Sequence, residues 1–522
     1  MCILIVFLTM FYIVVRTKKN LHILQQNFYN ENNRYIKWGN KNINSVFKID
    51  ILFIILNIIN LYLKSKGLLF FCILYVFLFL LEFNRLKNEQ VKIPLKITSR
   101  IKRLIITIII IYLLPIIYLF NNIYIFSLIY SILISINFYI LFIANIINKP
   151  IEKCVFLYYK NKAMKKIKNM NNLNVIGITG SYGKTSSKNI LNDILSVKFN
   201  SLATPKNYNT QYGLILTINN YLDKFNDIFI AEMGAFKMGR IKLLCNLVKP
   251  KYGIITSIGT AHLETFGSQE NIQKGKFELI ESLPIDGLGI LNMDDPYQVN
   301  YKLKNNCEIM WIGIENKNAD ILAKNIKMNS KGMEFDVYFK NEKETHTFKT
   351  KLLGNANIYN ILYGIAFAKY MGMSYEEIKI GVSRIKPIAH RLELKNMGDY
   401  TIIDDAYNSN PVGSKMALDV LNLMDGLKIV VTPGMIELGS KQYELNKKFG
   451  QYISNVADYV ILVGESQTKP ILDGLKENKY NKENISIIND VKEAFIIIDK
   501  LKKANKHTYI LLENDLPDIF NE

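Results

Sequence analysis

The stretch Asn174-Val-Ile-Gly-Ile-Thr-Gly-Ser-Tyr-Gly-Lys-Thr185 decides the fold expected of this chain. It has the pattern of an apolar strand, a glycine turn and the start of a helix. Gly180 and Gly183 let the backbone curl, so that successive N–H groups face a phosphate at the helix N-terminus. Lys184 would then reach the β- and γ-phosphates of a nucleotide, and the Thr185 hydroxyl would hold Mg²⁺.

The spacing of these glycines is not a standard match to the general pattern G-x-x-x-x-G-K-[ST]. A preceding strand and a following helix at Ser187–Leu195 nevertheless favour a phosphate site over an accidental Gly-Lys-Thr in a loop. The cofactors predicted from this segment are ATP and Mg²⁺. The residues predicted to bind the nucleotide here are Thr179, Gly180, Ser181, Gly183, Lys184, Thr185 and Ser186.

Two further polar residues follow apolar strands. Glu232 comes after Ile228–Ile230, and His262 comes after Tyr252–Ile255. Because ligands of an open α/β sheet collect at the carboxyl ends of its strands, a carboxylate and an imidazole there, with Thr185, would hold Mg²⁺ ions against a triphosphate. A lone loop histidine is more often structural, but its place beside Glu232 and the phosphate loop favours metal binding.

The last 130 residues show a second alternation of strand-like and helical segments. Strand-like runs at Tyr400–Ile403, Lys428–Val431, Tyr459–Val463 and Tyr509–Leu512 alternate with helical patterns, which predicts a smaller parallel α/β domain. The segment Asp404-Asp-Ala-Tyr-Asn-Ser-Asn-Pro411 directly follows the first of these strands. The alternative, purely structural interpretation of this segment is an Asx-rich turn that caps a helix.

Ordered motifs along residues 173–522 resemble the Mur ligase superfamily, most closely the branch that adds D-alanyl-D-alanine. They include the phosphate loop, Thr204–Gly213, Ala231-Glu-Met-Gly234, Thr256–Glu264, Leu291–Pro296, Leu353–Asn360, His390-Arg-Leu-Glu393, Asp404–Pro411 and Gly434–Gly439. The resemblance implies an ATP-dependent ligase, ADP-forming, that makes an amide through an acyl phosphate. It also implies a P-loop ATPase domain at 173–390 and a Rossmann-like C-terminal domain at 391–522.

The resemblance also assigns roles to single residues. Lys276 matches the family's carbamylated lysine, which helps to hold a second metal ion, and Lys274 is the alternative in another register. Asn357 matches an asparagine that contacts adenine, although Ala356 stands where the family usually has histidine. The predicted catalytic residues are thus Lys184, His262, Lys276 and Arg391, and the predicted metal ligands are Thr185, Glu232, His262 and Lys276.

In the C-terminal domain the resemblance gives Asp404 or Asp405 a contact to the ribose. It has Tyr407, Asn408 and Asn410 shape the site between the domains, and it has Arg391 reach phosphate. Two differences from the family pattern leave the identity of the substrate open. The family's UDP-binding domain has no counterpart, and an acidic stretch, Glu513–Asp518, replaces a basic one.

Residues 1–150 are predicted to be an all-α transmembrane region. Apolar runs lie at about 1–15, 49–63, 67–83, 104–120 and 123–147, and 23 of the 65 Lys and Arg residues lie within residues 1–170 against five acidic residues. The basic loops predict five spans with the remainder in the cytoplasm, joined by a basic linker at 151–172. The expected location is the cell membrane, with membrane lipid as a partner. Nucleic acid is not expected, because the basic excess does not lie on the globular part.

The sequence thus predicts an amide ligase of peptidoglycan precursor synthesis. Its carboxylate substrate would be a UDP- or lipid-linked muramyl peptide, and its amine an amino acid or dipeptide. One alternative is an amide ligase for a different envelope polymer or lipid-linked substrate, which the acidic Glu513–Asp518 stretch favours. A second alternative is a nucleotide-binding membrane scaffold without turnover.

Overall fold

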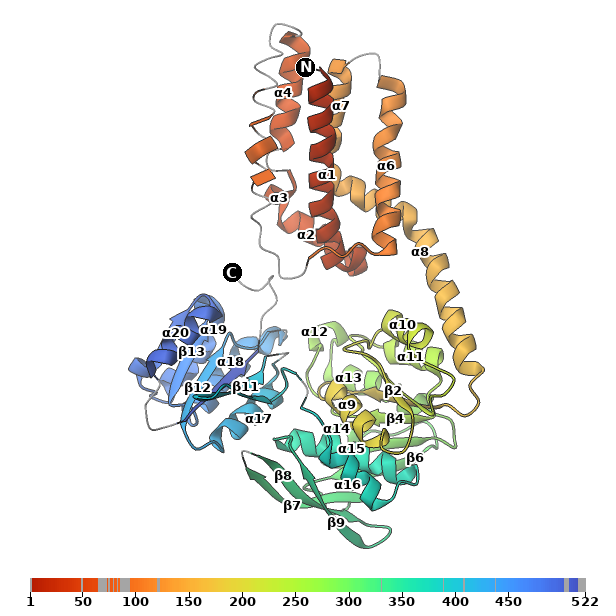
Figure 1. Cartoon of the computed structure of the whole chain (residues 1–522), viewed down its shortest axis with the longest axis vertical. Helices are drawn as coiled ribbons and strands as arrows, with labels where there is room; N and C mark the ends of the chain where they lie inside the picture. Colours follow the sequence, from red (N-terminus) through yellow and green to blue (C-terminus); the bar gives the residue numbers. More distant parts are fainter. Residues whose placement is uncertain are drawn as a thin grey trace. The chain divides into compact units, whose positions relative to one another are not determined.

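The computed structural model describes residues 2–47, 50–63, 73, 76–77, 79–81, 83–84, 94–119, 123–329, 331–387, 389–406, 409–436, 438–501 and 507–514. The chain divides into two compact units, Met1–Tyr158 and Tyr159–Glu522. The first unit is helical, and the second holds two β-sheets (Figure 1).

The N-terminal unit is a bundle whose core contains polar side chains. Its helices are α1 (Cys2–Gln26), α2 (Arg34–Lys41), α3 (Ile43–Phe47), α4 (Asp50–Leu63), α6 (Ser99–Leu119), α7 (Ile123–Ser135) and α8 (Asn137–Lys168). The Asn137 amide donates to Thr17 Oγ1 at 3.0 Å and to Tyr112 Oη at 2.8 Å. It also accepts from Asn20 Nδ2 at 2.7 Å, so one buried amide ties α8 to α1 and α6.

The predicted membrane spans are not supported by the helices that the structure describes. Among the described helices, none is by itself long and apolar enough to cross a bilayer. One pair, Leu128–Ser135 with Asn137–Lys168, has the composition jointly but bends by 73°. The predicted run at 67–83 lies largely outside the described residues.

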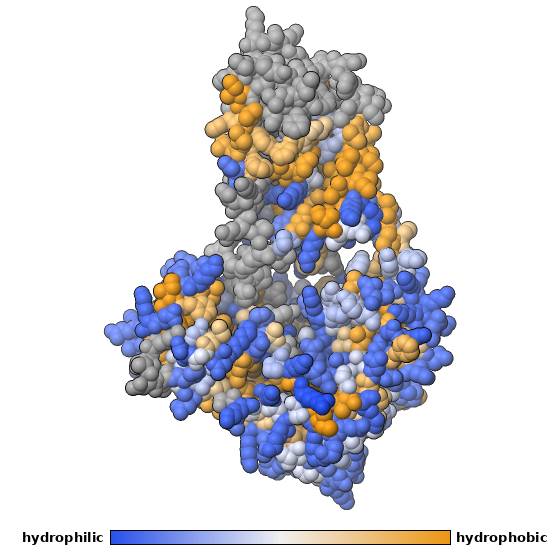
Figure 2. Space-filling model, viewed as in Figure 1, coloured by the Kyte–Doolittle hydropathy of each residue, from blue (hydrophilic) through white to orange (hydrophobic). Residues whose placement is uncertain are grey.

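This finding also corrects the predicted location in the cell membrane and removes the support for lipid as a partner. The predicted basic linker is different too, because α8 continues through it as far as Lys168. Figure 2 shows apolar side chains on the described surface of the N-terminal helices. Ile106, Ile109 and Ile110 of α6 are each at least half exposed.

The first sheet of the second unit, Tyr159–Glu522, has nine strands in the order β2-β3-β1-β4-β5-β6-β7-β8-β9. Its strands are β1 (Asn174–Thr179), β2 (Ser201–Ala203), β3 (Ile228–Glu232), β4 (Tyr252–Ile255), β5 (Leu288–Asn292), β6 (Glu308–Gly313), β7 (Ile321–Asn329), β8 (Gly332–Phe339) and β9 (Glu344–Thr350). All pairings up to β6–β7 are parallel, and β7-β8-β9 form an antiparallel extension. The central place of β1 puts the phosphate loop between the ends of β3 and β4.

Helices on both faces complete this domain. They are α9 (Lys184–Leu195), α10 (Gln211–Asn220), α11 (Arg240–Val248), α12 (Leu263–Phe266), α13 (Gln269–Phe277), α14 (Pro296–Val299), α15 (Asn355–Tyr370) and α16 (Tyr375–Ser383), with a 3-10 turn at Ile280–Ser282. α15 packs closely on α9, because a Cβ at Gly364 would lie only 2.5 Å from Ile194 Cδ1. A larger residue at position 364 would therefore require the Ile194 side chain to move.

The second sheet has six strands in the order β10-β11-β15-β12-β13-β14. Its elements are β10 (Glu393–Asn396), β11 (Tyr400–Asp405), α17 (Pro411–Asn422), β12 (Leu427–Thr432), α18 (Gln442–Ser454), β13 (Tyr459–Val463), α19 (Glu465–Glu477), β14 (Ile485–Ile488), α20 (Val491–Leu501) and β15 (Thr508–Glu513), with 3-10 turns at Gly439–Lys441 and Lys482–Asn484. Only β10 is antiparallel. The prediction of a second, smaller parallel α/β domain is confirmed.

Candidate active site

The phosphate loop is shaped by contacts that leave no room for a side chain at Gly180. A Cβ there would lie 2.0 Å from Thr256 Oγ1, and the backbone has a φ of 154°. The Ser181 N–H donates to the Ser257 carbonyl at 2.7 Å, while the Gly259 N–H donates to Ser181 Oγ at 2.9 Å. The loop after β4 therefore holds the phosphate loop from one side.

Lys184 begins α9 and folds back over this loop. Its ammonium donates to the carbonyl oxygens of Gly180 at 2.7 Å and Ser181 at 3.1 Å. Burial lowers its pKa to about 8, the nearby Glu232 carboxylate raises it, and Arg391 lowers it further. The ammonium thus lies at the mouth of the loop, where an anion would stabilise its charge.

Glu232, at the end of β3, is the centre of the polar contacts beneath the loop. The Thr185 hydroxyl donates to Oε1 at 3.0 Å and the Asn209 amide donates to the same oxygen at 3.1 Å. Lys188, one turn after Lys184 on α9, lies 3.1 Å from Oε2, and both side chains of this pair are 1 % exposed. These three contacts fix the orientation of the carboxylate.

A hydroxyl and a carboxylate are oxygen donors of the kind that Mg²⁺ prefers, so Thr185 and Glu232 fit that ion. Within the described part of the chain, no three His, Cys, Asp or Glu side chains form a metal cluster by themselves.

His262 and Lys276 lie on the other side of the loop. His262 has a left-handed φ of 61° at the start of α12, and its pKa is lowered to about 4 by burial of the ring and by the charges of Lys276 and Lys184. The imidazole is therefore neutral at physiological pH and able to bind a metal ion. The Lys276 ammonium is buried 3.4 Å from the Ala235 carbonyl, and burial lowers its pKa well below the usual value.

Lys274, the alternative to Lys276, is exposed on α13. The structure also shows the surroundings of three other residues that were predicted to bind the nucleotide. Thr179 Oγ1 donates to the Met233 carbonyl at 2.9 Å and is fully buried, and Ser186 is also buried. The Asn357 amide donates to the Leu353 carbonyl at 2.8 Å near the start of α15.

The C-terminal motif places two carboxylates at the end of β11. Asp404 is buried and accepts from the Ala406 N–H, from His390 Nδ1 at 2.8 Å and from the Lys395 ammonium. These contacts hold its pKa below the usual value against the effect of burial. Asp405 accepts from the Leu392 N–H at 3.2 Å. Tyr407 and Asn408 lie outside the described residues.

Arg391 lies close enough to the phosphate loop for its charge to lower the pKa of both Lys184 and Lys188. His390, which precedes it, has a φ of 61° where the resembling family has glycine. Glycine adopts this conformation without steric cost, whereas a histidine there is strained, and the hydrogen bond to Asp404 offsets that strain.

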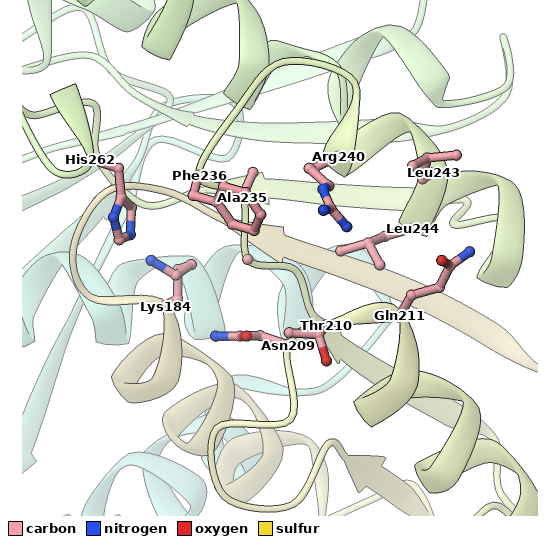
Figure 3. A pocket seen from close by; sticks show the side chains of 11 residues that line it. Lys184, Asn209, Thr210, Gln211, Ala235, Phe236, Arg240, Leu243, Leu244 and His262 are labelled. Carbon is pink, nitrogen blue, oxygen red and sulfur yellow. The ribbon is translucent and has the colours of Figure 1, made fainter. Parts of the chain in front are cut away.

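Three functional candidates were missed from the sequence. Lys188 and Asn209 hold Glu232, and Arg240 lines a cavity beside Lys184 and His262 (Figure 3). Lys188 had a usable signal, because it lies four residues after Lys184 and so on the same face of α9. Asn209 and Arg240 lie far from the phosphate loop in sequence and only the fold brings them to it.

A phosphate loop with donors for Mg²⁺, faced by a neutral histidine and a buried lysine, defines a nucleotide-dependent enzyme of the ligase type. Residues 178–368 match the Mur ligase middle domain, and residues 390–512 match the Mur ligase glutamate ligase domain. The chain belongs to the Mur ligase family. It is an ATP-dependent, ADP-forming amide ligase that uses Mg²⁺, of the kind that builds peptidoglycan precursors.

The chain is 32% identical over 339 residues to the UDP-N-acetylmuramoyl-tripeptide–D-alanyl-D-alanine ligase of Bacillus subtilis, a match that covers 64% of this chain and 71% of the relative. A MurF ligase from Thermotoga maritima, solved in complex with ADP, aligns with a TM-score of 0.61 and 25% identity over 69% of this chain and 80% of that one. The fold is also that of a UDP-N-acetylmuramoylalanyl-D-glutamyl-2,6-diaminopimelate–D-alanyl-D-alanyl ligase from Acinetobacter baumannii, with a TM-score of 0.61 and 24% identity over 69% and 76% of the two chains.

Proposed function

We propose that this ligase joins the terminal carboxylate of a muramyl peptide to the amine of D-alanyl-D-alanine. The observation that carries the proposal is the convergence of Lys184, Glu232 and His262 on one phosphate loop, beside a cavity open to a second substrate. The names of the relatives from Bacillus and Acinetobacter supply the substrate class.

In the proposed reaction the γ-phosphorus of ATP forms a bond to a carboxylate oxygen as its bond to the ADP oxygen breaks. The amine nitrogen then attacks the acyl carbon, inorganic phosphate leaves, and the nitrogen loses its proton. Lys184 and Arg391 would offset the charge that develops on the transferring phosphoryl group. Catalysis of this kind consists mostly of positioning and charge neutralisation.

We assign the metal contacts to the residues that the sequence predicted. Thr185 and Glu232 would hold one Mg²⁺, and His262 with Lys276 would hold a second. Bound Mg²⁺ would supply positive charge to the phosphate oxygens. Carbamylation of Lys276 turns an amine into an anionic oxygen ligand, and the lowered pKa of this buried amine supports that step because only the uncharged amine adds to carbon dioxide.

The nucleotide assignments extend to the second domain. We propose that the ATP-binding domain ends near residue 390 and that residues 391–522 close over the nucleotide. Of the two ribose candidates, Asp405 is favoured, because the Asp404 carboxylate is already bound by His390 and Lys395. Closure would bring Arg391 against phosphate and exclude water from the acyl phosphate.

The test uses the full-length protein with ATP and Mg²⁺. UDP-N-acetylmuramoyl-tripeptide and D-alanyl-D-alanine together should release ADP and give the amide, identified by mass spectrometry. ADP release that is independent of the amine would contradict the proposal. Replacing D-alanyl-D-alanine by a panel of amino acids and diamines tests the rival amide ligase for another envelope polymer, which the acidic stretch Glu513–Asp518 favours.

A further inference from the structure

The segment that leads into β10 holds Arg391 between two residues with unusual backbone angles. His390 has a φ of 61° and Leu392 has a φ of 49°. Residues other than glycine rarely adopt this left-handed conformation, because the Cβ then lies close to the following carbonyl oxygen. Such angles persist only where the surrounding structure imposes them, and they gather at functional sites. The contacts that impose them therefore indicate what the segment does.

Each of these two residues is bonded to one of two consecutive aspartates at the end of β11. His390 Nδ1 lies 2.8 Å from Asp404 Oδ2, and the Leu392 N–H donates to Asp405 Oδ1 at 3.2 Å. The imidazole is the donor in the first bond, since the pKa of Asp404 is held below its usual value and a carboxylate can only accept. The backbone on both sides of Arg391 is thus tied to the same strand.

Asp404 is a firm anchor for this arrangement. Its side chain is only 6 % exposed, and it also accepts from the Ala406 N–H at 3.2 Å and from the Lys395 ammonium. Lys395 lies on β10, which pairs with β11 so that Glu393 is opposite Asp404. The imidazole of His390 is therefore held by a group that cannot move without the C-terminal sheet.

The guanidinium of Arg391 acts on groups at both ends of its reach. Burial is the main reason that the pKa values of Lys184 and Lys188 are lowered, and the charge of Arg391 lowers them further. The same charge lowers the pKa of Asp405 against the larger, opposite effect of burial. An arginine side chain has several rotatable bonds, so its position between the phosphate loop and β11 depends on how firmly its backbone is held.

We propose that His390 is a positioning residue for Arg391: its hydrogen bond to Asp404 fixes the backbone from which the guanidinium extends toward phosphate. The inference rests on the proposed function, in which Arg391 offsets charge on the transferring phosphoryl group. Closure of the C-terminal domain then carries a preset arginine to the nucleotide and does not have to order the segment at the same time. In this role His390 acts through Arg391 and needs no contact with substrate.

Three substitutions separate the hydrogen bond from other properties of the imidazole. His390→Ala removes the donor and should lower kcat for amine-dependent ADP release by roughly 10–100-fold, the cost of a misplaced catalytic group. His390→Asn places an amide nitrogen where Nδ1 lies and tolerates the left-handed angle, so kcat should stay within about threefold of the wild type. His390→Gln places its amide one atom further out and should resemble the alanine variant.

A double-mutant cycle shows whether His390 acts through Arg391. In an Arg391→Ala background, His390→Ala should change kcat by less than about twofold, because no guanidinium is left to position. The matched control is His507→Ala, which removes a histidine bonded at 2.9 Å to Thr401, at the opposite end of β11, and should leave kcat unchanged. Wild-type kcat in His390→Ala, an equal loss in both backgrounds, or rescue by glutamine as complete as by asparagine would overturn the proposal.

A readout without catalysis decides the case in which the wild type shows no amine-dependent ADP release and the proposed function itself fails. Trypsin cuts after Arg391 only when this segment opens locally. On the full-length protein, with the cut mapped by mass spectrometry, His390→Ala should raise the rate of cleavage at Arg391 by roughly tenfold, whereas His390→Asn should not. Equal rates in the wild type and the alanine variant would show that the hydrogen bond does not hold the segment, which refutes the role of His390.

Discussion

Lys188 and Glu232 form an ion pair inside the catalytic unit, residues Tyr159–Glu522, with 3.1 Å between Nζ and Oε2. Thr185 and Asn209 donate to the other carboxylate oxygen. Burial lowers the pKa of Lys188 and the Glu232 carboxylate raises it, so each charge makes the other tolerable in the interior. A proposed metal ligand is thus held in place before any ion arrives.

Lys188→Met should destabilise the catalytic unit strongly. Removing one partner of a buried pair leaves the other charge uncompensated, which costs about 3–5 kcal/mol. The measurement is the urea midpoint of the catalytic unit by circular dichroism. The control is Lys198→Met, which removes a lysine paired with Glu377 at an exposed site and should cost no more than about 1 kcal/mol. Similar losses for the two variants would show that the Lys188–Glu232 pair is not what stabilises this region.

Lys184→Ala should lower kcat for amine-dependent ADP release by roughly 100–1,000-fold, the effect of removing one preorganised donor from a developing anion. Lys274→Ala, at an exposed position on α13, should keep wild-type activity. Near-normal turnover without Lys184 would remove it from the catalytic residues.

Lys276 should carry a carbamate. Protein incubated with ¹³C-bicarbonate should show a carbamate carbonyl signal by NMR that is absent in Lys276→Ala and present in Lys274→Ala. The reverse pattern would move the modified lysine to position 274, the other register that the sequence allowed.

The pair Asp405 and Glu513 should make stability depend on pH. They face each other on β11 and β15, and burial raises the pKa of Asp405 to about 6 and that of the fully buried Glu513 well above its usual value. The folded state then binds more protons than the unfolded state above about pH 4. The free energy of unfolding is therefore higher at low pH, and it falls as the pH rises through 6.

Glu513→Gln keeps an acceptor for the Ser409 hydroxyl, which donates to Oε1, and removes the charge. It should raise the stability of the C-terminal domain at pH 8 by about 1–3 kcal/mol, and it should flatten the change between pH 5 and pH 8. Thermal unfolding of the full-length chain at both values measures this. An unchanged pH profile would mean that burial does not raise the pKa of Glu513 in the folded protein.

Much of the catalytic unit was predictable because its signals are local. The strands before Gly180, Glu232 and His262 are short apolar runs, and the polar residue after each one marks a carboxyl end that a parallel sheet brings to one edge. The predicted strands at Tyr252–Ile255 and Tyr459–Val463 match β4 and β13 residue for residue. The antiparallel extension β7-β8-β9 was not predicted, since a sheet's outer strands depend on pairing between distant segments.

The N-terminal prediction failed for a related reason. Apolar composition over 1–150 indicates burial, but it does not show where helices end, and the structure ends α7 at Ser135, where the chain bends by 73° into α8. The buried network around Asn137 is likewise invisible in a hydropathy pattern, because its partners Thr17 and Tyr112 are remote in sequence.

The hydrogen bonds that Ser181 and Gly259 exchange have a kinetic consequence. They connect the phosphate loop, which would surround the nucleotide, to the segment that ends in His262. Neither segment can therefore move without the other. Arrival of the triphosphate would set the imidazole in position for the incoming peptide, and the enzyme should therefore load its two large substrates in a fixed sequence, nucleotide first.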